Sequence, residues 1–113
     1  MSRIYKILPR ADWLAADAAG RFEGSAVDLA DGYIHFSTVA QAQETARRHF
    51  AGQEDLVLLE IETDDLGDQL KWEPSRGGDL FPHLYIALEA QAVRAVIEAP
   101  LGEDGVPQVR LAG

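Results

Sequence analysis

The sequence has no cysteine among its 113 residues. This absence excludes disulfide bonds, iron–sulfur clusters, thiol catalysis and zinc sites that depend on thiolate ligands. The sequence also lacks any apolar run near the ~20 residues that a membrane-spanning helix needs, and no apolar signal-peptide core is visible at its N-terminus. We therefore expect a cytoplasmic protein without a membrane partner.

Basic residues are scarce as well. Ten Lys and Arg stand against nineteen Asp and Glu, which gives a net charge of −9. An acidic surface repels phosphate backbones, so the composition disfavours long nucleic acid as a partner. A local basic pocket for a small anionic ligand stays compatible with this charge, and nothing in the sequence identifies a protein partner.

The order of predicted elements indicates a single α+β domain, residues 1–113. Alternating apolar residues and β-formers predict strands at residues 3–8, 33–37, 55–63, 70–73, 83–88, 93–99 and 108–111. Helices are predicted at residues 11–19 and 38–50. Because no regular βαβ alternation occurs, we expect these two main helices to pack on a mostly antiparallel sheet.

Three local signals support these boundaries. Gly20 suits the left-handed residue that ends the first helix. Thr38, with Gln41 three residues later, fits a capping box at the start of the second helix. Residues 21–32 are rich in Gly, Ser and Asp, so we expect a loop with at most one short helical turn.

The chain has no P-loop, dinucleotide fingerprint, G-x-S-x-G or HExxH motif. The candidate residues are therefore a looser set, beginning with His35 and Ser37 in YIHFS. Strand alternation places both on one polar face with Tyr33, and backbone N–H groups near Ser37 and Thr38 can hold an anion where the helix begins. The simpler alternatives are that Thr38 only caps the helix and that His35 is a buried histidine bonded to a carbonyl.

The stretch KWEPSRGGDLFPHLY, residues 71–85, supplies the remaining candidates. His83 and Tyr85 are predicted to share one strand face, with Leu84 and Ile86 toward the core. Two histidines on one sheet can bind a ligand or transfer a proton, unless His83 is simply a surface or structural residue. These histidines and a carboxylate are also metal-ligand types, but their spacing does not demand a metal, so we predict none.

Three further residues of this stretch have chemistry suited to a flap over a cleft. Trp72 can stack on an aromatic ring or fill the core. Arg76, beside Gly77 and Gly78, offers a guanidinium that fits a phosphate or carboxylate, although a surface arginine in a turn is an equal alternative. Glu73 precedes a proline and offers a carboxylate.

The sequence resembles the domain of unknown function 952 family. The resemblance rests on DGYIHFST (residues 31–38), DLVLLEI (residues 55–61), the stretch at residues 71–85 and the opening IYKI followed by Trp13. It covers essentially the whole chain. The family is uncharacterised, and its fold is similar to that of ADP-ribosyltransferases, a split, mostly antiparallel β-sandwich with a nicotinamide-dinucleotide cleft between two half-sheets.

The resemblance implies positions for functional residues. Lys6 would occupy the first-strand site, where His or Arg is typical, and His35 or Ser37 the second. His83 lies at or near the third site, where the related fold usually has a catalytic Glu. This departure weakens the catalytic case, because a neutral histidine stabilises an oxocarbenium-like transition state poorly; Glu73 is the candidate substitute.

Together these observations predict a cleft for a nucleotide-like or small anionic ligand, with NAD a candidate substrate and no other cofactor identified. If the protein is an enzyme, N-glycosidic cleavage or ADP-ribosyl-type transfer is expected, with His35, His83 and Glu73 as catalytic residues. The expected ligand-binding residues are Lys6, Ser37, Thr38, Trp72, Arg76 and Tyr85. The alternatives are a non-catalytic sensing or interaction module that has lost the catalytic Glu, and a phosphotransferase acting on an RNA end.

Overall fold

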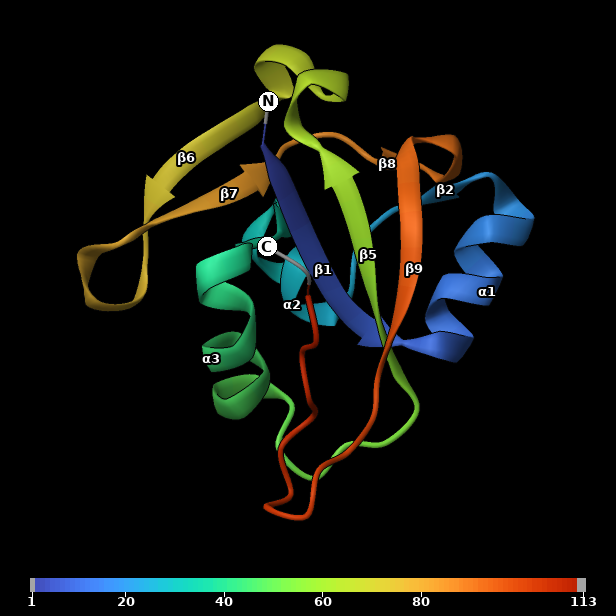
Figure 1. Ribbon diagram of the computed structural model, residues 1–113. Helices are drawn as coiled ribbons and strands as arrows, with labels where there is room; N and C mark the ends of the chain where they lie inside the picture. The colour runs from blue at the N-terminus through green and yellow to red at the C-terminus, as the bar shows by residue number, and fades with distance from the viewer. Residues whose placement is uncertain (1, 112–113) are drawn as a thin grey trace.

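The computed structural model describes residues 2–111 and confirms the α+β class (Figure 1). This part of the chain has three helices, α1 Arg10–Ala19, α2 Ala26–Asp31 and α3 Val39–His49. Its strands are β1 Arg3–Pro9, β2 Arg21–Phe22, β3 Ile34–His35, β4 Ser37–Thr38, β5 Leu56–Glu62, β6 Leu70–Pro74, β7 Leu80–Leu84, β8 Leu88–Glu89 and β9 Val93–Ala99.

The strands form three separate sheets, and all their pairings are antiparallel. The largest sheet has the order β4-β1-β5-β9, a smaller one the order β3-β7-β6, and β2 pairs with β8. Because β4 pairs only with Ile4 and Tyr5 of β1, the rest of that edge of β1 has no neighbouring strand. This open edge borders the cavity described below.

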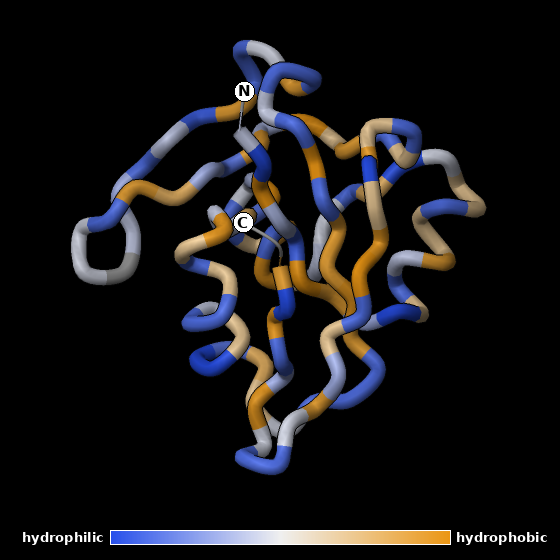
Figure 2. The backbone as a smooth tube through the Cα atoms, in the orientation of Figure 1, coloured by the Kyte–Doolittle hydropathy of each residue, from blue (hydrophilic) through white to orange (hydrophobic). Residues whose placement is uncertain are grey.

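The two central strands of the four-stranded sheet, β1 and β5, are buried on both faces. Ile4 and Leu8 of β1 belong to a first core that includes Trp13 of α1, whereas Tyr5 and Ile7 belong to a second core beneath α3. This arrangement explains why β1 and β5 are almost continuously buried rather than alternating. Figure 2 shows the same distribution, with apolar residues along the central strands and hydrophilic residues on the outer turns of the helices.

Several predicted elements are confirmed. The strands at β1, β5 and β9 match the expected ranges within one or two residues. Helix α1 ends at Gly20, whose φ of 88° is the left-handed conformation that glycine adopts without steric cost. Helix α3 begins after Thr38, whose hydroxyl accepts a hydrogen bond from the Gln41 N–H while the Gln41 side chain returns one to the Thr38 N–H.

The predicted strand at residues 33–37 is wrong in one respect that matters for the site. The chain breaks at Phe36 into two short strands that join different sheets, since β3 pairs with β7 and β4 with β1. Phe36 itself is buried, and its N–H donates to the Pro82 carbonyl at 3.0 Å. Residues 34–38 therefore pass from the three-stranded sheet, through β3, to the four-stranded sheet, through β4.

The predicted strand at residues 83–88 is also misplaced, because β7 runs from Leu80 to Leu84 with Pro82 inside it. The N–H and C=O of one residue in an antiparallel strand point to the same side. The Pro82 carbonyl faces Phe36, which follows the last residue of β3. The N–H that proline lacks would point to the same side, beyond the end of β3. The strand ends before Ile86, which is half exposed rather than in the core.

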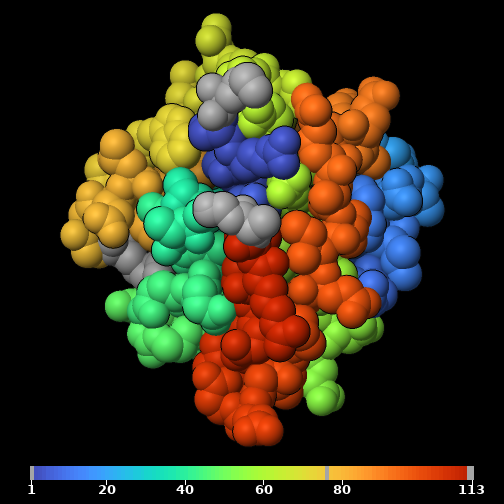
Figure 3. All heavy atoms as spheres, viewed as in Figure 1, coloured from blue at the N-terminus to red at the C-terminus, as the bar shows by residue number. Residues whose placement is uncertain are grey.

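Two further expectations are corrected. Residues 21–32 contain the strand β2 and the six-residue helix α2 where a loop with at most one short helical turn was expected, so the described residues form three α-helices rather than two. Residues 108–111 form no strand; the C-terminal segment crosses the front of the sheet between α3 and β9 (Figure 3). Gln43 of α3 holds it by hydrogen bonds to the Pro107 carbonyl and the Val109 N–H, and Val109 and Leu111 pack on the second core.

Candidate functional site

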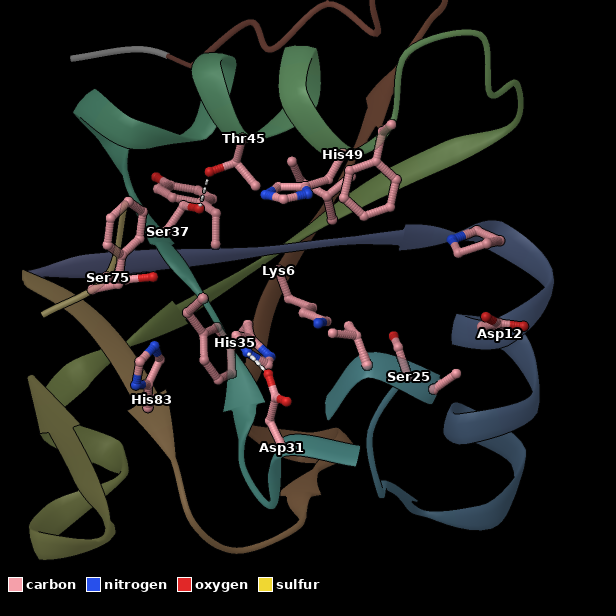
Figure 4. Close-up of a pocket in the computed structure, with 18 residues that line it drawn as sticks. Lys6, Asp12, Ser25, Asp31, His35, Ser37, Thr45, His49, Ser75 and His83 are labelled. Carbon is pink, nitrogen blue, oxygen red and sulfur yellow. Dashed lines mark hydrogen bonds and ion pairs between the residues drawn. The ribbon is translucent and has the colours of Figure 1, made fainter. Parts of the chain in front are cut away.

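A cavity of about 590 Å³ lies between the four-stranded and three-stranded sheets, and we call it the inter-sheet cavity. Residues of β1 and β4 line it from the larger sheet, and residues of β3 and β7 line it from the smaller one. Figure 4 shows β1 and α3 on one side of it and β3, β7 and α2 on the other. Its volume lies within the range of roughly 300–1,000 Å³ typical of small-molecule sites.

Two histidines lie side by side on the wall formed by the smaller sheet. His35 of β3 and His83 of β7 are direct partners in the strand register, and their ring centroids are 5.4 Å apart. Tyr33 stacks on His83 at 4.1 Å and contacts His35 at 4.7 Å. Tyr33 and His35 were predicted to share a face, and the structure places His83 beside them; both histidines line the cavity.

His35 is held by two carboxylates of α2. Its Nδ1 lies 2.6 Å from Asp28 Oδ1, and its Nε2 lies 2.9 Å from Asp31 Oδ2, which is the contact drawn in Figure 4. The backbone N–H of His35 also donates to Asp28. The orientation of this imidazole is therefore fixed at both ring nitrogens.

Asp28 is a buried acid at the centre of this network, with a side chain only 1% exposed. It accepts hydrogen bonds from Lys6 Nζ at 2.8 and 3.1 Å and from the Ser25 N–H at 2.9 Å, in addition to those from His35. Burial alone would raise the pKa of Asp28, but the hydrogen bond from His35 and the charge of Lys6 outweigh it and lower the pKa to about 2. Asp28 is therefore ionised at neutral pH.

Lys6 enters this network from β1, on the face that carries the first core. Burial lowers the pKa of its ammonium group, and the Asp28 carboxylate opposes that shift. The Lys6 side chain is 6% exposed and lines the cavity, but its charge is already matched by Asp28. Its predicted role in ligand binding stays a prediction, and the positive charge that it can offer to a ligand is reduced.

His83 has a different environment. Its Nδ1 lies 2.8 Å from Glu73 Oε1 across the β6–β7 pair, and the Tyr85 hydroxyl donates to the same oxygen at 2.7 Å. These hydrogen bonds from Tyr85 and His83 hold the pKa of Glu73 below its usual value, while Glu73 raises the pKa of Tyr85 to about 12. Glu73 acts on the cavity through His83, because it is not itself among the residues that line it.

The opposite wall offers hydroxyl groups. Ser37 Oγ and Thr45 Oγ1 are 2.8 Å apart, and both residues line the cavity where β4 meets α3. His49 lies about one turn further along α3; it is exposed and also lines the cavity. Thr38 caps α3 and is not a lining residue.

Comparison with protein families gives a match to the family described as "Protein of unknown function (DUF952)" over residues 7–96. The match spans most of the chain. This chain belongs to the DUF952 family. All of the site residues described above except Lys6 fall within the matched span.

Two solved structures are similar to this DUF952 chain over nearly its whole length. The crystal structure of Protein CC0527 from Caulobacter crescentus is 60% identical, covers 95% of this chain and 94% of that chain, and has a TM-score of 0.92. The solution NMR structure of CC0527 is also 60% identical, covers 96% of this chain and 93% of that chain, and has a TM-score of 0.86. Both are described as structural genomics targets, and no curated protein matches the chain.

The structure places the other predicted residues less centrally. Trp72 is 43% exposed and does not line the cavity, and the same is true of Tyr85 at 42%. The backbone of Arg76 lies in a 3₁₀ turn, Arg76–Gly78, but its side chain falls outside the part that the structure describes. Ser75, next to it, does line the cavity. The roles of Trp72, Arg76 and Tyr85 in ligand binding stay predictions.

Four residues of the site were missed in the sequence: Asp28, Asp31, Tyr33 as a stacking residue, and Thr45. One signal was available, because Ser25 and Asp28 have the spacing of a capping box, and the Ser25 N–H does donate to Asp28. Nothing local indicates that the same aspartate also meets Lys6 and His35, since that contact depends on how α2 packs against β1 and β3.

No helix in the described part of the chain is long and apolar enough to cross a membrane. Among residues 2–111 there is also no group of three or more histidine and carboxylate side chains arranged to hold a metal ion.

Proposed function

We propose that the inter-sheet cavity binds a nucleotide-like small molecule, with nicotinamide dinucleotide as the leading candidate, in a cleft of the ADP-ribosyltransferase-like type. The observation that carries this proposal is the register pair His35 and His83 on one wall, facing the Ser37–Thr45 hydroxyl pair on the other. Imidazole and hydroxyl groups suit the hydroxyls of a ribose, which both donate and accept hydrogen bonds.

The shape of the site supports the same proposal. The cavity lies between two antiparallel sheets joined at Phe36, as expected for a cleft between two half-sheets. Aromatic side chains of Phe36, Phe50 and Phe81 line it beside the polar groups. A mainly apolar cavity with a few convergent polar groups is the usual form of a small-molecule site, so a small molecule is favoured over nucleic acid or protein as the partner.

Catalysis at an N-glycosidic bond is the extension of this proposal. The substituted sugar carbon gains positive charge in the transition state, so a carboxylate must help to stabilise it. Glu73 is the candidate, acting through His83. The rival function, a ligand-sensing module without catalysis, is favoured by one observation: Glu73 is occupied by His83 and Tyr85 and lies behind the wall rather than on it.

The test is a titration with oxidised nicotinamide dinucleotide, followed through the imidazole signals by NMR. We expect shifts of His35 and His83 that are lost in the His35→Ala and His83→Ala variants. Arg94→Gln is the matched control, because Arg94 pairs with Asp65 and neither residue lines the cavity. This variant should bind the dinucleotide as the wild-type protein does. No shift at millimolar dinucleotide rejects the dinucleotide, and an assay of released nicotinamide then separates an enzyme from a sensor.

A further inference from the structure

We propose that the two histidines of the inter-sheet cavity have different roles: His83 contacts the ligand through Nε2 and accepts a hydrogen bond from a ligand hydroxyl, whereas His35 is a positioning residue held as an imidazolium. This assignment deepens the proposed function and rests on it. It also narrows the ligand, since this wall then recognises a sugar hydroxyl rather than a phosphate.

The role of His35 follows from counting its donors. A neutral imidazole carries one N–H, and an ionised carboxylate can only accept. Nδ1 is hydrogen-bonded to Asp28 at 2.6 Å, and Nε2 lies 2.9 Å from Asp31 Oδ2 in an ion-pair contact. A neutral ring would point one nitrogen lone pair at a carboxylate oxygen, whereas a ring with two protons presents an N–H to a carboxylate at each nitrogen. Neither ring nitrogen is then left for a ligand.

The surroundings of His35 support the charged form. The buried Asp28 is shared with Lys6, so one carboxylate serves two cations, and Asp31 supplies the second negative charge. Among the described residues, the rings of Tyr33 and His83 also contact the His35 ring, at 4.7 and 5.4 Å between centroids. When His35 is protonated, the two positive charges of Lys6 and His35 are balanced by the two negative charges of Asp28 and Asp31.

The role of His83 follows from the opposite count. Only Nδ1 has a partner among the side chains that the structure describes, and that partner is the Glu73 carboxylate. An N–H at Nδ1 that donates to a carboxylate leaves the Nε2 lone pair as an acceptor. The side chain is 4% exposed, and Tyr33 stacked at 4.1 Å and the Glu73 contact both fix the plane of the ring. Nε2 is therefore a preoriented acceptor on a residue that lines the cavity.

The charges near the wall favour a hydroxyl donor over an anion. An acceptor nitrogen repels phosphate oxygens, and the positive charges of Lys6 and His35 are already matched by Asp28 and Asp31. A ribose hydroxyl has the proton that Nε2 needs. The same contact can also transfer a proton: the O–H bond of the hydroxyl breaks, an N–H bond forms at Nε2, and the products are a sugar alkoxide and an imidazolium that Glu73 stabilises.

The first experiment measures the protonation of each ring by ¹⁵N NMR in the unliganded protein near neutral pH. We expect two protons on His35, and one proton on His83 at Nδ1. Asp31→Asn removes one negative charge at an exposed position and should shift His35 toward the neutral ring while leaving His83 unchanged. A neutral His35 in the wild-type protein, or a proton at Nε2 of a neutral His83, overturns the assignment.

The second experiment uses nicotinamide riboside, ADP-ribose and inorganic phosphate as probes. We expect the riboside and ADP-ribose to shift the Nε2 signal of His83, and phosphate alone not to do so. His83→Gln places an amide group near the position of Nε2, whereas His83→Asn reaches only that of Nδ1, so the Asn variant should lose about tenfold more affinity, the worth of one hydrogen bond.

The outcomes separate the two proposals. If none of the ribose compounds binds, the proposed function fails. If a ribose compound binds while the His83 signals stay unchanged, or if the Gln and Asn variants lose affinity equally, only the assignment of roles fails.

Discussion

Asp28→Asn is the change for which the structure gives the largest expected effect. The substitution keeps the shape of the side chain and removes its charge. It leaves the Lys6 ammonium, whose side chain is 6% exposed, without a counter-charge, and it gives His35 a neutral partner in place of a carboxylate. The Ser25 N–H at the start of α2 also loses a charged acceptor.

The size of the effect follows from the burial of the pair. Breaking a buried ion pair by removing one partner typically costs about 3–5 kcal/mol, because the remaining charge is uncompensated. Small domains have free energies of unfolding of roughly 5–15 kcal/mol, so Asp28→Asn should remove a large fraction of the stability. We expect the loss to lie in that range of about 3–5 kcal/mol.

The assay is urea denaturation followed by circular dichroism, with two comparison variants. Asp31→Asn changes a carboxylate whose side chain is 45% exposed, so it should cost at most about 1 kcal/mol. The double variant Lys6→Met, Asp28→Asn removes the stranded charge and should recover part of the loss. The reasoning is refuted if Asp28→Asn costs less than about 1 kcal/mol, or if the double variant is less stable than the single one.

Three further predictions test other parts of the structure. Thr38→Ala should cost about 1 kcal/mol in urea denaturation, because the Thr38 hydroxyl caps α3; no loss would mean that the cap is replaced. Glu73→Gln should bring the pKa of Tyr85 down from about 12 toward ~10 in a spectrophotometric titration, and an unchanged value would contradict the 2.7 Å contact. The lowered pKa of Asp28 contributes about 2 kcal/mol of stability, which should be fully present above its ordinary value of 3.8 and be lost as the pH falls toward 2; Asp28→Asn should lack this part of the acid dependence.

The elements that the sequence predicted well are those whose signals are local. Apolar β-formers placed β1, β5 and β9, and the Thr38–Gln41 pattern placed the start of α3. The break at Phe36 was not predictable in this way, because the alternation of YIHFS continues through it. The strand is interrupted because its pairing partner changes, from β7 before Phe36 to β1 after it. A five-residue pattern carries no information about pairing with distant strands.

The same limit applies to the site. His35 and His83 were predicted to lie on one sheet, and the register places them directly opposite each other. Lys6 was predicted as a ligand-binding residue, and the sequence of one strand cannot show that a carboxylate 22 residues later also reaches it. Trp72 was predicted either to contact a ligand or to fill the core; it is 43% exposed and does not line the cavity, so it does not fill the core, and its ligand contact stays a prediction.

Asp28 has a consequence for how this protein can change over generations or in the laboratory. One carboxylate supports the first turn of α2, neutralises a lysine inside the core and orients a histidine of the cavity. A substitution at this position changes all of these properties together, so folding and the proposed ligand recognition cannot be tuned separately there. Asp31, which touches the same imidazole from the surface, offers that freedom, and engineering of the cavity should begin with it.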